Sequence, residues 1–195
     1  MTESRAAATL FGALGLLERA ISYTMGNLHN VTSAALSRPT PCRDWDLSDL
    51  LAHMNDSLTA LHDAIDLGHV GLSPATGGGD PATDLVAALR ERAGLLLGAC
   101  ARTEGDLVSV GGCPVSASVV TIAGAVEVAI HGWDVAQACG RPRPIPSQLA
   151  EELLQLAPLL VTAADRPGRF AAPVACAPGA GPAVRLIAFL GRDPG

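Results

Sequence analysis

A carboxylate and an imidazole lie one helical turn apart in the most apolar stretch of the chain. Glu127 and His131 occur within residues 115–140, VSASVVTIAGAVEVAIHGWDVAQACG. At a spacing of four residues the two side chains share one face of a helix. Because an unpaired carboxylate is costly to bury among valine and isoleucine, Glu127 should be protonated, ion-paired or metal-bound. The pair predicts two ligands of one metal ion; the alternative is a Glu–His hydrogen bond within a helical core.

A third candidate ligand, His53, lies on another predicted helix, residues 47–67. It falls at the edge of the apolar stripe beside Ser57, Ala60 and Ala64, whose small side chains leave room for an ion and a ligand. The same small residues also suit close helix packing, and a single histidine is more often a hydrogen-bonded core residue than a ligand. Two imidazoles and one carboxylate suit Zn²⁺, Ni²⁺ or Fe²⁺ and leave coordination positions open for water or substrate.

Asp134 is the nearest further acidic residue. It follows His131 by three positions and Glu127 by seven, so it stays near their helical face. We interpret it either as an acceptor for the second ring nitrogen of a ligand histidine or as a general base. An ordinary polar residue near the end of a helix remains the alternative.

The loop over residues 39–46, PTPCRDWD, precedes the second predicted helix. Proline disfavours helix in the residue before it, so the first helix should end here. Asp46 has the side chain of an N-cap, and Trp45 with Leu50 occupies the N′ and N4 positions of a hydrophobic staple. Trp45 therefore has a structural explanation. We interpret Cys42 as a packed loop cysteine rather than a reactive thiol.

Hydrophobic spacing predicts an all-α chain with four long helices. Pro158 must kink or divide a fifth helix, and residues 170–177 predict a short extended segment. Helix bundles build metal sites from side chains on facing helices, as the positions of the candidate ligands require. The four long helices are expected over residues 6–36, 47–67, 81–103 and 115–140, with shorter ones over 148–164 and 183–190.

The composition excludes several classes of protein. The chain has 195 residues, 49% of them hydrophobic and 3% aromatic, enough for one domain with an aliphatic core. Its net charge is −6, and the 13 basic residues, all arginine, form no basic stripe, which argues against nucleic acid as a partner. Five cysteines without a C-x-x-C pair argue against a disulfide framework and predict a reducing cytoplasm.

No segment predicts a membrane anchor. The N-terminus has no basic region leading into a long apolar segment, so we expect no signal peptide. The apolar run over residues 115–130 is interrupted by Glu127 and is too short to span a bilayer. We therefore expect a cytoplasmic protein with a small-molecule substrate and no membrane partner. The sequence leaves a homodimer open.

Several stretches, taken together, resemble the actinobacterial branch of the DinB-like superfamily, the group named for mycothiol-dependent maleylpyruvate isomerase. The resemblance implies a DinB-type four-helix bundle over residues 1–145. It also implies a short C-terminal α or α+β extension over residues 146–195, packed on the bundle as one compact unit. The matching stretches are PCRDWD at 41–46 leading into LLAHM at 50–54, EVAIHGWD at 127–134 and AFLGRDP at 188–194.

The same resemblance implies a divalent metal at His53, Glu127 and His131, zinc first, with nickel or iron as alternatives. It also implies the use of mycothiol or a similar low-molecular-weight thiol. A metal-bound thiol ionises near neutral pH and becomes a nucleophile. We therefore expect a metal-dependent isomerase or thiol S-transferase that acts on a small electrophilic metabolite. Binding of substrate oxygens to the metal, with stabilisation of an enolate, is the other mechanism left open.

Rival functions use the same residues differently. A metal-dependent hydrolase would need a general base beside the metal, and Asp134 is the local candidate. A non-catalytic metal- or small-ligand-binding protein would use the bundle cavity without turnover. A non-haem iron oxygenase shares the ligand set, but such sites are usually carried on a β-barrel rather than on helices. The sequence does not choose the substrate.

Overall fold

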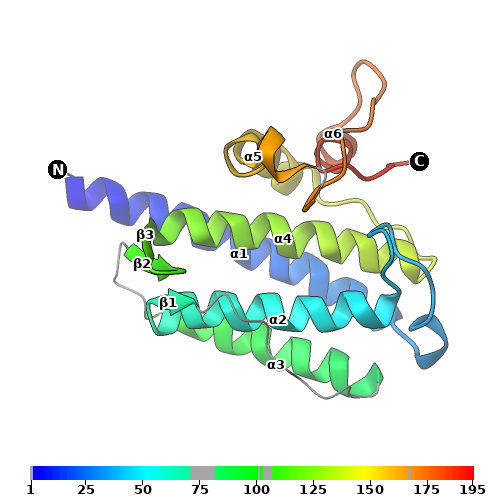
Figure 1. The fold of residues 1–195 in the computed structure, drawn as a ribbon, viewed down its shortest axis with the longest axis horizontal. Coiled ribbons are helices and arrows are strands. Elements are labelled where there is room, and N and C mark those ends of the chain that lie inside the picture. The colour runs from blue at the N-terminus through cyan, green and yellow to red at the C-terminus, as the bar shows by residue number, and fades with distance from the viewer. Residues whose placement is uncertain (1, 71–81, 101, 103–106, 167) are drawn as a thin grey trace.

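The computed structural model describes residues 2–70, 82–100, 102, 107–166 and 168–195. Four long helices lie side by side as a bundle, and two shorter helices, α5 and α6, lie together on one side of it (Figure 1). The predicted four-helix bundle is confirmed. The helices are α1 (Thr2–Asn27), α2 (Leu47–Asp66), α3 (Ala82–Cys100), α4 (Ala117–Ala138), α5 (Ser147–Leu160) and α6 (Pro182–Phe189).

The first helix is shorter at its C-terminal end than the sequence suggests. α1 stops at Asn27, and two short 3-10 turns, Leu28–Asn30 and Ser33–Ala35, carry the chain to the loop before α2. The apolar spacing continues through these turns because Leu28 and Ala35 are still buried against the bundle. The helical spacing of apolar residues therefore continues beyond the C-terminal end of α1.

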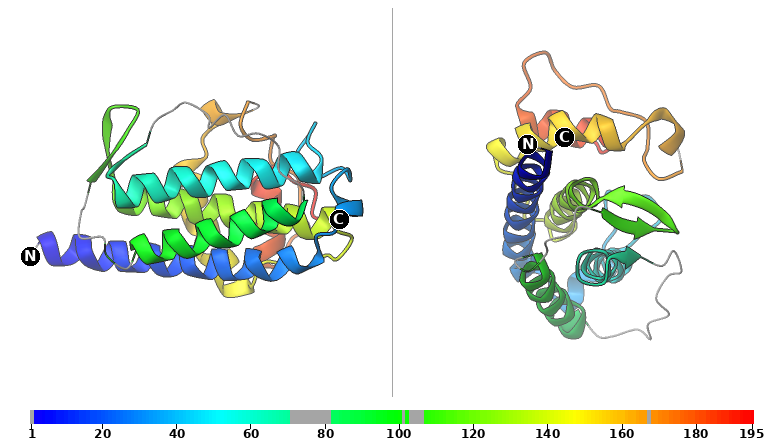
Figure 2. Two further views of the ribbon diagram at one scale, coloured as in Figure 1. Left: turned by 90° about the horizontal axis from the view of Figure 1, so that it is seen from below. Right: turned by 90° about the vertical axis from the view of Figure 1, so that its left-hand side faces the viewer.

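α4 is the central helix of the molecule. It packs against α1, α2 and α5, and the end-on view in Figure 2 places it beside α1, with the layer of α5 and α6 on one side and α2 on the other. Its length and composition would allow a membrane span, but 72% of its most apolar window is buried inside the molecule. Such burial is typical of the core helix of a soluble protein.

Close contact with α1 fixes the position of α4. The hydroxyl of Thr24 donates a hydrogen bond to the Val128 carbonyl at 2.8 Å, and the Asn27 amide donates to the Gly132 carbonyl at 2.9 Å. A Cβ atom at Gly132 would overlap the Thr24 side chain. Only glycine therefore permits this approach, which sets the height of His131 relative to the neighbouring helices.

The start of α2 is fixed by the predicted cap. The Asp46 side chain accepts from the Asp49 backbone N–H at 3.0 Å, and the Asp49 carboxylate accepts from the Asp46 N–H at 3.3 Å. This reciprocal capping box satisfies two backbone donors that the first turn would otherwise leave unpaired. It also fixes the residue at which the helix begins.

A small three-stranded sheet was not predicted. β2 (Leu107–Val110) and β3 (Cys113–Ser116) form an antiparallel hairpin, and β1 (His69–Val70) pairs in parallel with β2. The apolar spacing predicts that the fourth long helix begins at residue 115. The chain instead continues as β3 and enters α4 at Ala117. The strands escape prediction because four residues give too little alternation of apolar and polar side chains to stand out.

The C-terminal part is tied to the bundle by an ion pair. The Arg19 guanidinium on α1 donates to both carboxylate oxygens of Glu152 on α5, at 2.8 and 2.7 Å.

Pro158 lies inside α5 without dividing it, because the helix ends two residues later. Residues 171–177 form no strand, and the expected extended segment is irregular chain held by a bond from the Val174 N–H to the Ala188 carbonyl. The boundary between residues 1–145 and 146–195 stays a prediction.

Candidate metal centre

Two facing helices bring the three candidate ligands together. His53 Nε2 on α2 lies 2.7 Å from Glu127 Oε1, and His131 Nε2 lies 3.1 Å from the same oxygen. The two imidazole rings are nearly perpendicular, with centroids 5.1 Å apart and an interplanar angle of 84°. One ligand atom from each residue lies within 4.8 Å of the others. Three donors of the types that divalent transition metals prefer therefore converge on one point.

The cluster runs from the interior to the surface. The His131 side chain is 7% exposed, that of Glu127 29% and that of His53 36%. The buried end is formed by α4 and the more open end by α2. A small molecule can therefore approach the cluster from the His53 side, while His131 is closed off by the bundle.

The electrostatics of the cluster favour an ionised carboxylate. Burial alone would raise the pKa of Glu127, but the charges and hydrogen bonds of His131 and His53 outweigh it and lower the pKa well below its usual range. Burial alone would lower the pKa of His131, but Glu127, Asp134 and Cys42 together raise it well above its usual range. A metal ion at the cluster would have to displace the proton of His131, because ligand histidines bind metals in their neutral form.

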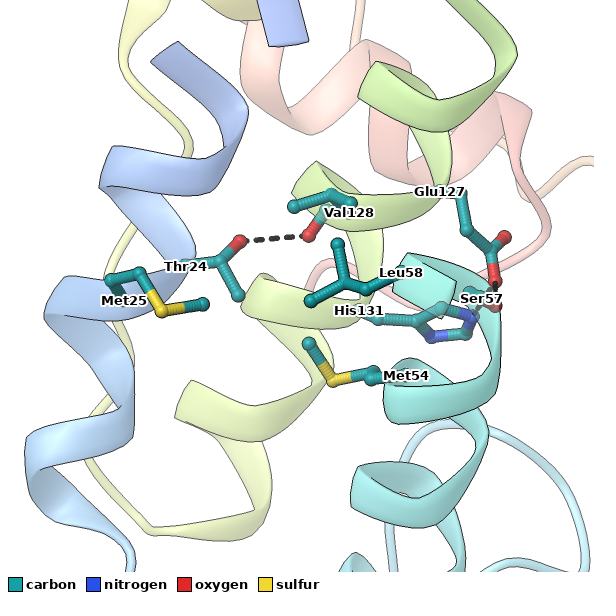
Figure 3. A pocket seen from close by; sticks show the side chains of 8 residues that line it. All are labelled: Thr24, Met25, Met54, Ser57, Leu58, Glu127, Val128 and His131. Atoms are coloured by element: carbon teal, nitrogen blue, oxygen red, sulfur yellow. Dashed lines mark hydrogen bonds and ion pairs between the residues drawn. The ribbon is translucent and has the colours of Figure 1, made fainter. Parts of the chain in front are cut away.

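A small pocket opens beside the cluster, between α1, α2 and α4. Figure 3 shows Glu127, Ser57 and His131 on one side of this pocket and Met25 on the other. The Ser57 hydroxyl donates to Glu127 Oε1 at 3.2 Å, which further fixes the carboxylate. The pocket therefore joins a polar cluster to an apolar wall. Its lining residues are Thr24, Met25, Met54, Ser57, Leu58, Glu127, Val128 and His131.

Asp134 lies behind His131. Its Oδ2 is 3.0 Å from His131 Nδ1, and its side chain is 0% exposed. Burial alone would raise the pKa of Asp134, but the hydrogen bond with His131 and the charge of Arg192 lower it. Asp134 therefore holds the ring nitrogen that faces away from Glu127, as one of its two interpretations expected.

Arg192, on the segment after α6, completes this polar chain. Its Nη2 donates to Asp134 Oδ2 at 3.0 Å, and its Nε lies 3.4 Å from Asp134 Oδ1. The preceding Gly191 has a φ of +81°, and a Cβ atom there would meet the Ala171 backbone. The left-handed glycine thus turns the chain so that Arg192 points inward. Sequence reasoning did not single out Arg192, although it belongs to the GRDP stretch of the family motif.

Two residues of the 39–46 loop also reach the cluster. The Cys42 thiol donates to Asp134 Oδ2 at 3.2 Å and lies 3.7 Å from His131 Nδ1. The Trp45 ring centroid is 4.7 Å from that of His53 and 6.5 Å from that of His131. The sequence analysis explained both residues by local packing. Their position directly before the helix that bears His53 was the available signal for a role at the site.

Cys42, His131 and Asp134 form a second group with metal-ligand spacing. The Arg192 guanidinium lies 3.3 Å from Cys42 Sγ and 3.0 Å from Asp134 Oδ2. A fixed positive charge on two of the three donors repels a metal cation. The His53 cluster is therefore the better cation site, and the second group supports it from behind His131.

Comparison with known proteins identifies the family. A family model described as the mycothiol maleylpyruvate isomerase N-terminal domain matches residues 17–136. The chain belongs to this family. Two Mycobacterium tuberculosis proteins described as uncharacterized, from strains CDC 1551 / Oshkosh and ATCC 25618 / H37Rv, are each 30% identical over 170 residues, which is 85% of this chain and 89% of the relative.

Solved structures have the same fold. Crystal structures of a mycothiol-dependent maleylpyruvate isomerase and of a point mutant of that enzyme match with TM-scores of 0.60 and 0.57, at 22% and 20% identity. Each match covers 76% of this chain and 68% of the other. The family and the mostly helical DinB-like fold expected from the sequence motifs are therefore confirmed.

The region shared with the mycothiol maleylpyruvate isomerase N-terminal domain family contains most of the cluster. His53, Glu127, His131 and Asp134 all lie within the matched residues 17–136. Arg192 lies outside that region and reaches the cluster from the C-terminal part. The site of this family member is thus built from the common bundle and completed by a segment beyond it.

Proposed function

We propose that the chain is a metal-dependent enzyme that uses mycothiol or a similar low-molecular-weight thiol to isomerise or conjugate a small electrophilic metabolite. The observation that supports it most is the convergence of His53, Glu127 and His131 in a member of this family. These three residues would hold the metal, zinc first, with nickel or iron as alternatives. When bound, a divalent cation at this position would keep a thiol ionised near neutral pH.

The residues around the ligands would hold them in place. Asp134 accepts from His131 Nδ1, which fixes the ring so that Nε2 faces Glu127 and makes the imidazole a stronger ligand. Ser57 donates to Glu127 Oε1 and limits rotation of the carboxylate. The site is thereby organised before any ligand arrives, which reduces the entropy lost on binding.

The pocket beside the cluster would give the site an apolar boundary. Met25, Met54 and Leu58 supply an apolar wall opposite Glu127 and His131. An apolar wall excludes water and strengthens interactions of the polar groups with a charged or polarised reactant. Isomerisation would return the thiol after rotation about the former double bond, whereas transfer would leave the thiol attached to the product.

The orientation of Asp134 counts against the hydrolase alternative. Asp134 faces Nδ1 of His131, whereas Glu127 faces Nε2, so the imidazole separates the two carboxylates. A general base must reach the proton that it removes, directly or through one water. A non-catalytic ligand-binding role remains the second candidate, because the pocket is small and its lining is mostly apolar.

A cytoplasmic location is part of the proposal. All five cysteines are free thiols, and two of them, Cys113 and Cys176, are exposed. Exposed free thiols persist in a reducing compartment, where low-molecular-weight thiols are also available.

Metal content tests the proposal directly. Tag-free wild type should carry about one metal ion per chain by inductively coupled plasma mass spectrometry, as expected for one three-ligand site, and His53→Ala and Glu127→Ala should carry none. His29→Ala is the matched control, because His29 is exposed and lies outside the cluster. Metal-loaded protein should then turn over an electrophile such as maleylpyruvate only with thiol present. A wild type that takes up no metal, even after reconstitution, would refute the proposal.

A further inference from the structure

We propose that Trp45 is the positioning residue of His53, so that an indole face rather than a hydrogen-bond acceptor holds this imidazole in place. This inference rests on the proposed metal centre and assigns a role to a residue that capping geometry alone explained. It is carried by the contrast between the two imidazoles and by the way in which Trp45 is itself held.

Among the residues that the structure describes, no protein group bonds the second ring nitrogen of His53. Ligand histidines usually bond a carboxylate, carbonyl or water through the ring nitrogen that does not face the metal. Asp134 serves His131 in this way. In the part of the chain that the structure describes, the polar side-chain contacts of His53 are made by Nε2, to Glu127 and Ser57, and none is made by Nδ1.

In place of a hydrogen-bond acceptor, the Trp45 indole packs against the His53 ring. Its ring centroid lies 4.7 Å from that of His53, with an interplanar angle of 50°. Tilted and offset pairs at this separation are favoured contacts between aromatic rings. The same indole lies 6.5 Å from His131. One side chain therefore flanks both imidazoles and restricts rotation of the more exposed one.

The backbone holds the indole at this position. The Trp45 N–H donates to the Cys42 carbonyl at 3.2 Å, and the Trp45 carbonyl accepts from the N–H and the hydroxyl of Thr40, at 3.1 and 3.0 Å. Asp44 has a φ of +69° and is the only non-glycine residue with positive φ among those the structure describes. Asp44 is the third residue of the turn that the Cys42–Trp45 bond closes, and a left-handed residue at this position sets the direction in which the chain enters Trp45.

The surface position of Trp45 fits the same role. The residue is 36% exposed, although an indole is large and apolar enough to be buried. Its ring packs against the His53 imidazole, so its position involves more than the start of α2. Trp45 stands at the open end of the cluster, where His53 has the most freedom to turn.

The test is the Zn²⁺ affinity of Trp45→Ala and Trp45→Phe, measured by competition with a chromophoric chelator. Trp45→Ala should bind Zn²⁺ about 10- to 100-fold more weakly, the loss typical of removing the support of a ligand. Trp45→Phe keeps an aromatic face and should recover most of the affinity. The control is Asp46→Ala, which removes the cap beside Trp45 and loosens the start of α2 while keeping the indole.

The outcomes separate this inference from the proposed function. Wild-type Zn²⁺ affinity in Trp45→Ala would overturn it while leaving the metal centre intact. An equal loss in Asp46→Ala, at the same loss of melting temperature in the metal-free proteins, would show that loop stability alone matters and would also overturn it. Failure of the wild type to bind Zn²⁺ would instead refute the metal centre.

A Co²⁺ spectrum gives a readout that a merely structural role would not move. The visible absorption bands of bound Co²⁺ report the geometry of its ligands. Trp45→Ala should change the positions and intensities of these bands, because His53 becomes free to rotate, whereas Asp46→Ala should leave them as in the wild type. Identical spectra in all three proteins would contradict the inference.

Discussion

The two imidazoles of the cluster are held in opposite ways. His131 is buried, with Glu127 at one ring nitrogen and Asp134 at the other. His53 is 36% exposed in its side chain, has polar partners at one nitrogen, and rests against the Trp45 indole. The difference separates a rigid half of the site on α4 from an adjustable half on α2. A ligand that enters from the surface meets the adjustable half first.

The first prediction concerns the stability of the metal-free protein, where the two halves should differ most. His131→Ala should lower the free energy of unfolding by about 3 kcal/mol, because it leaves buried charged groups without their partner. His53→Ala should lower it by less than about 1 kcal/mol, since a partly exposed ion pair contributes little. Urea titration measures both values. Equal losses would mean that the two imidazoles are held alike.

Arg192 should give the next largest effect, through Asp134. Arg192→Gln removes the guanidinium that compensates this buried carboxylate, and we expect a loss of about 2 kcal/mol in unfolding free energy and of about tenfold in Zn²⁺ affinity. Arg192→Lys should recover only part of each, because an ammonium cannot reproduce the fork of a guanidinium. Arg185→Gln, on the exposed face of α6, is the control. A stability loss with unchanged Zn²⁺ affinity would mean that Arg192 supports the fold but does not influence the metal ligands.

The pH dependence of stability should be controlled by His131, in the rigid half of the site. The pKa of His131 is raised in the folded state, so its contribution to stability is complete below the unfolded pKa of about 6.5 and is lost as pH rises through the folded pKa. Metal-free protein should therefore lose stability above neutral pH, whereas Zn²⁺ affinity should increase because the metal competes with the proton. Chemical unfolding between pH 6 and 10 measures this, and Glu127→Gln should flatten the profile.

The smallest effect is expected away from both imidazoles, at Tyr23 on α1. Its hydroxyl donates to the Arg143 carbonyl at 2.6 Å, and burial raises its pKa to about 12. Because Tyr23 is the one tyrosine in the chain, absorbance at 295 nm should show a single ionisation near that pH in folded protein. Tyr23→Phe should cost about 1 kcal/mol in stability and leave Zn²⁺ affinity unchanged. A shift in affinity would mean that Tyr23 also helps to position the ligands.

Sequence patterns were enough to predict that His53, Glu127 and His131 lie together, because local rules place them. The spacing of Glu127 and His131 puts them on one helical face, and His53 faces them from the neighbouring helix. Long amphipathic helices carry strong periodic signals, which is why the bundle was predicted. Whether these donors bind a metal stays a prediction.

The surroundings of the cluster could not be predicted from local patterns. Arg192 meets Cys42 across 150 positions of sequence, and no periodicity encodes that contact. The hydrophobic staple at the start of α2 already explains a tryptophan at position 45, so the sequence gives no reason to expect its contact with His53. The hairpin before α4 was missed for a different reason, because its strands are only four residues long.

The contact between Arg192 and Asp134 has a consequence for the order in which the protein matures. Asp134 lies 58 positions before Arg192, so during synthesis the bundle is complete well before its compensating guanidinium emerges from the ribosome. Until then, the buried carboxylate behind His131 lacks its cation and the helices around it are held less firmly. Docking of the C-terminal segment is therefore the step that locks His131, and metal uptake should become tight only after Arg192 has reached Asp134.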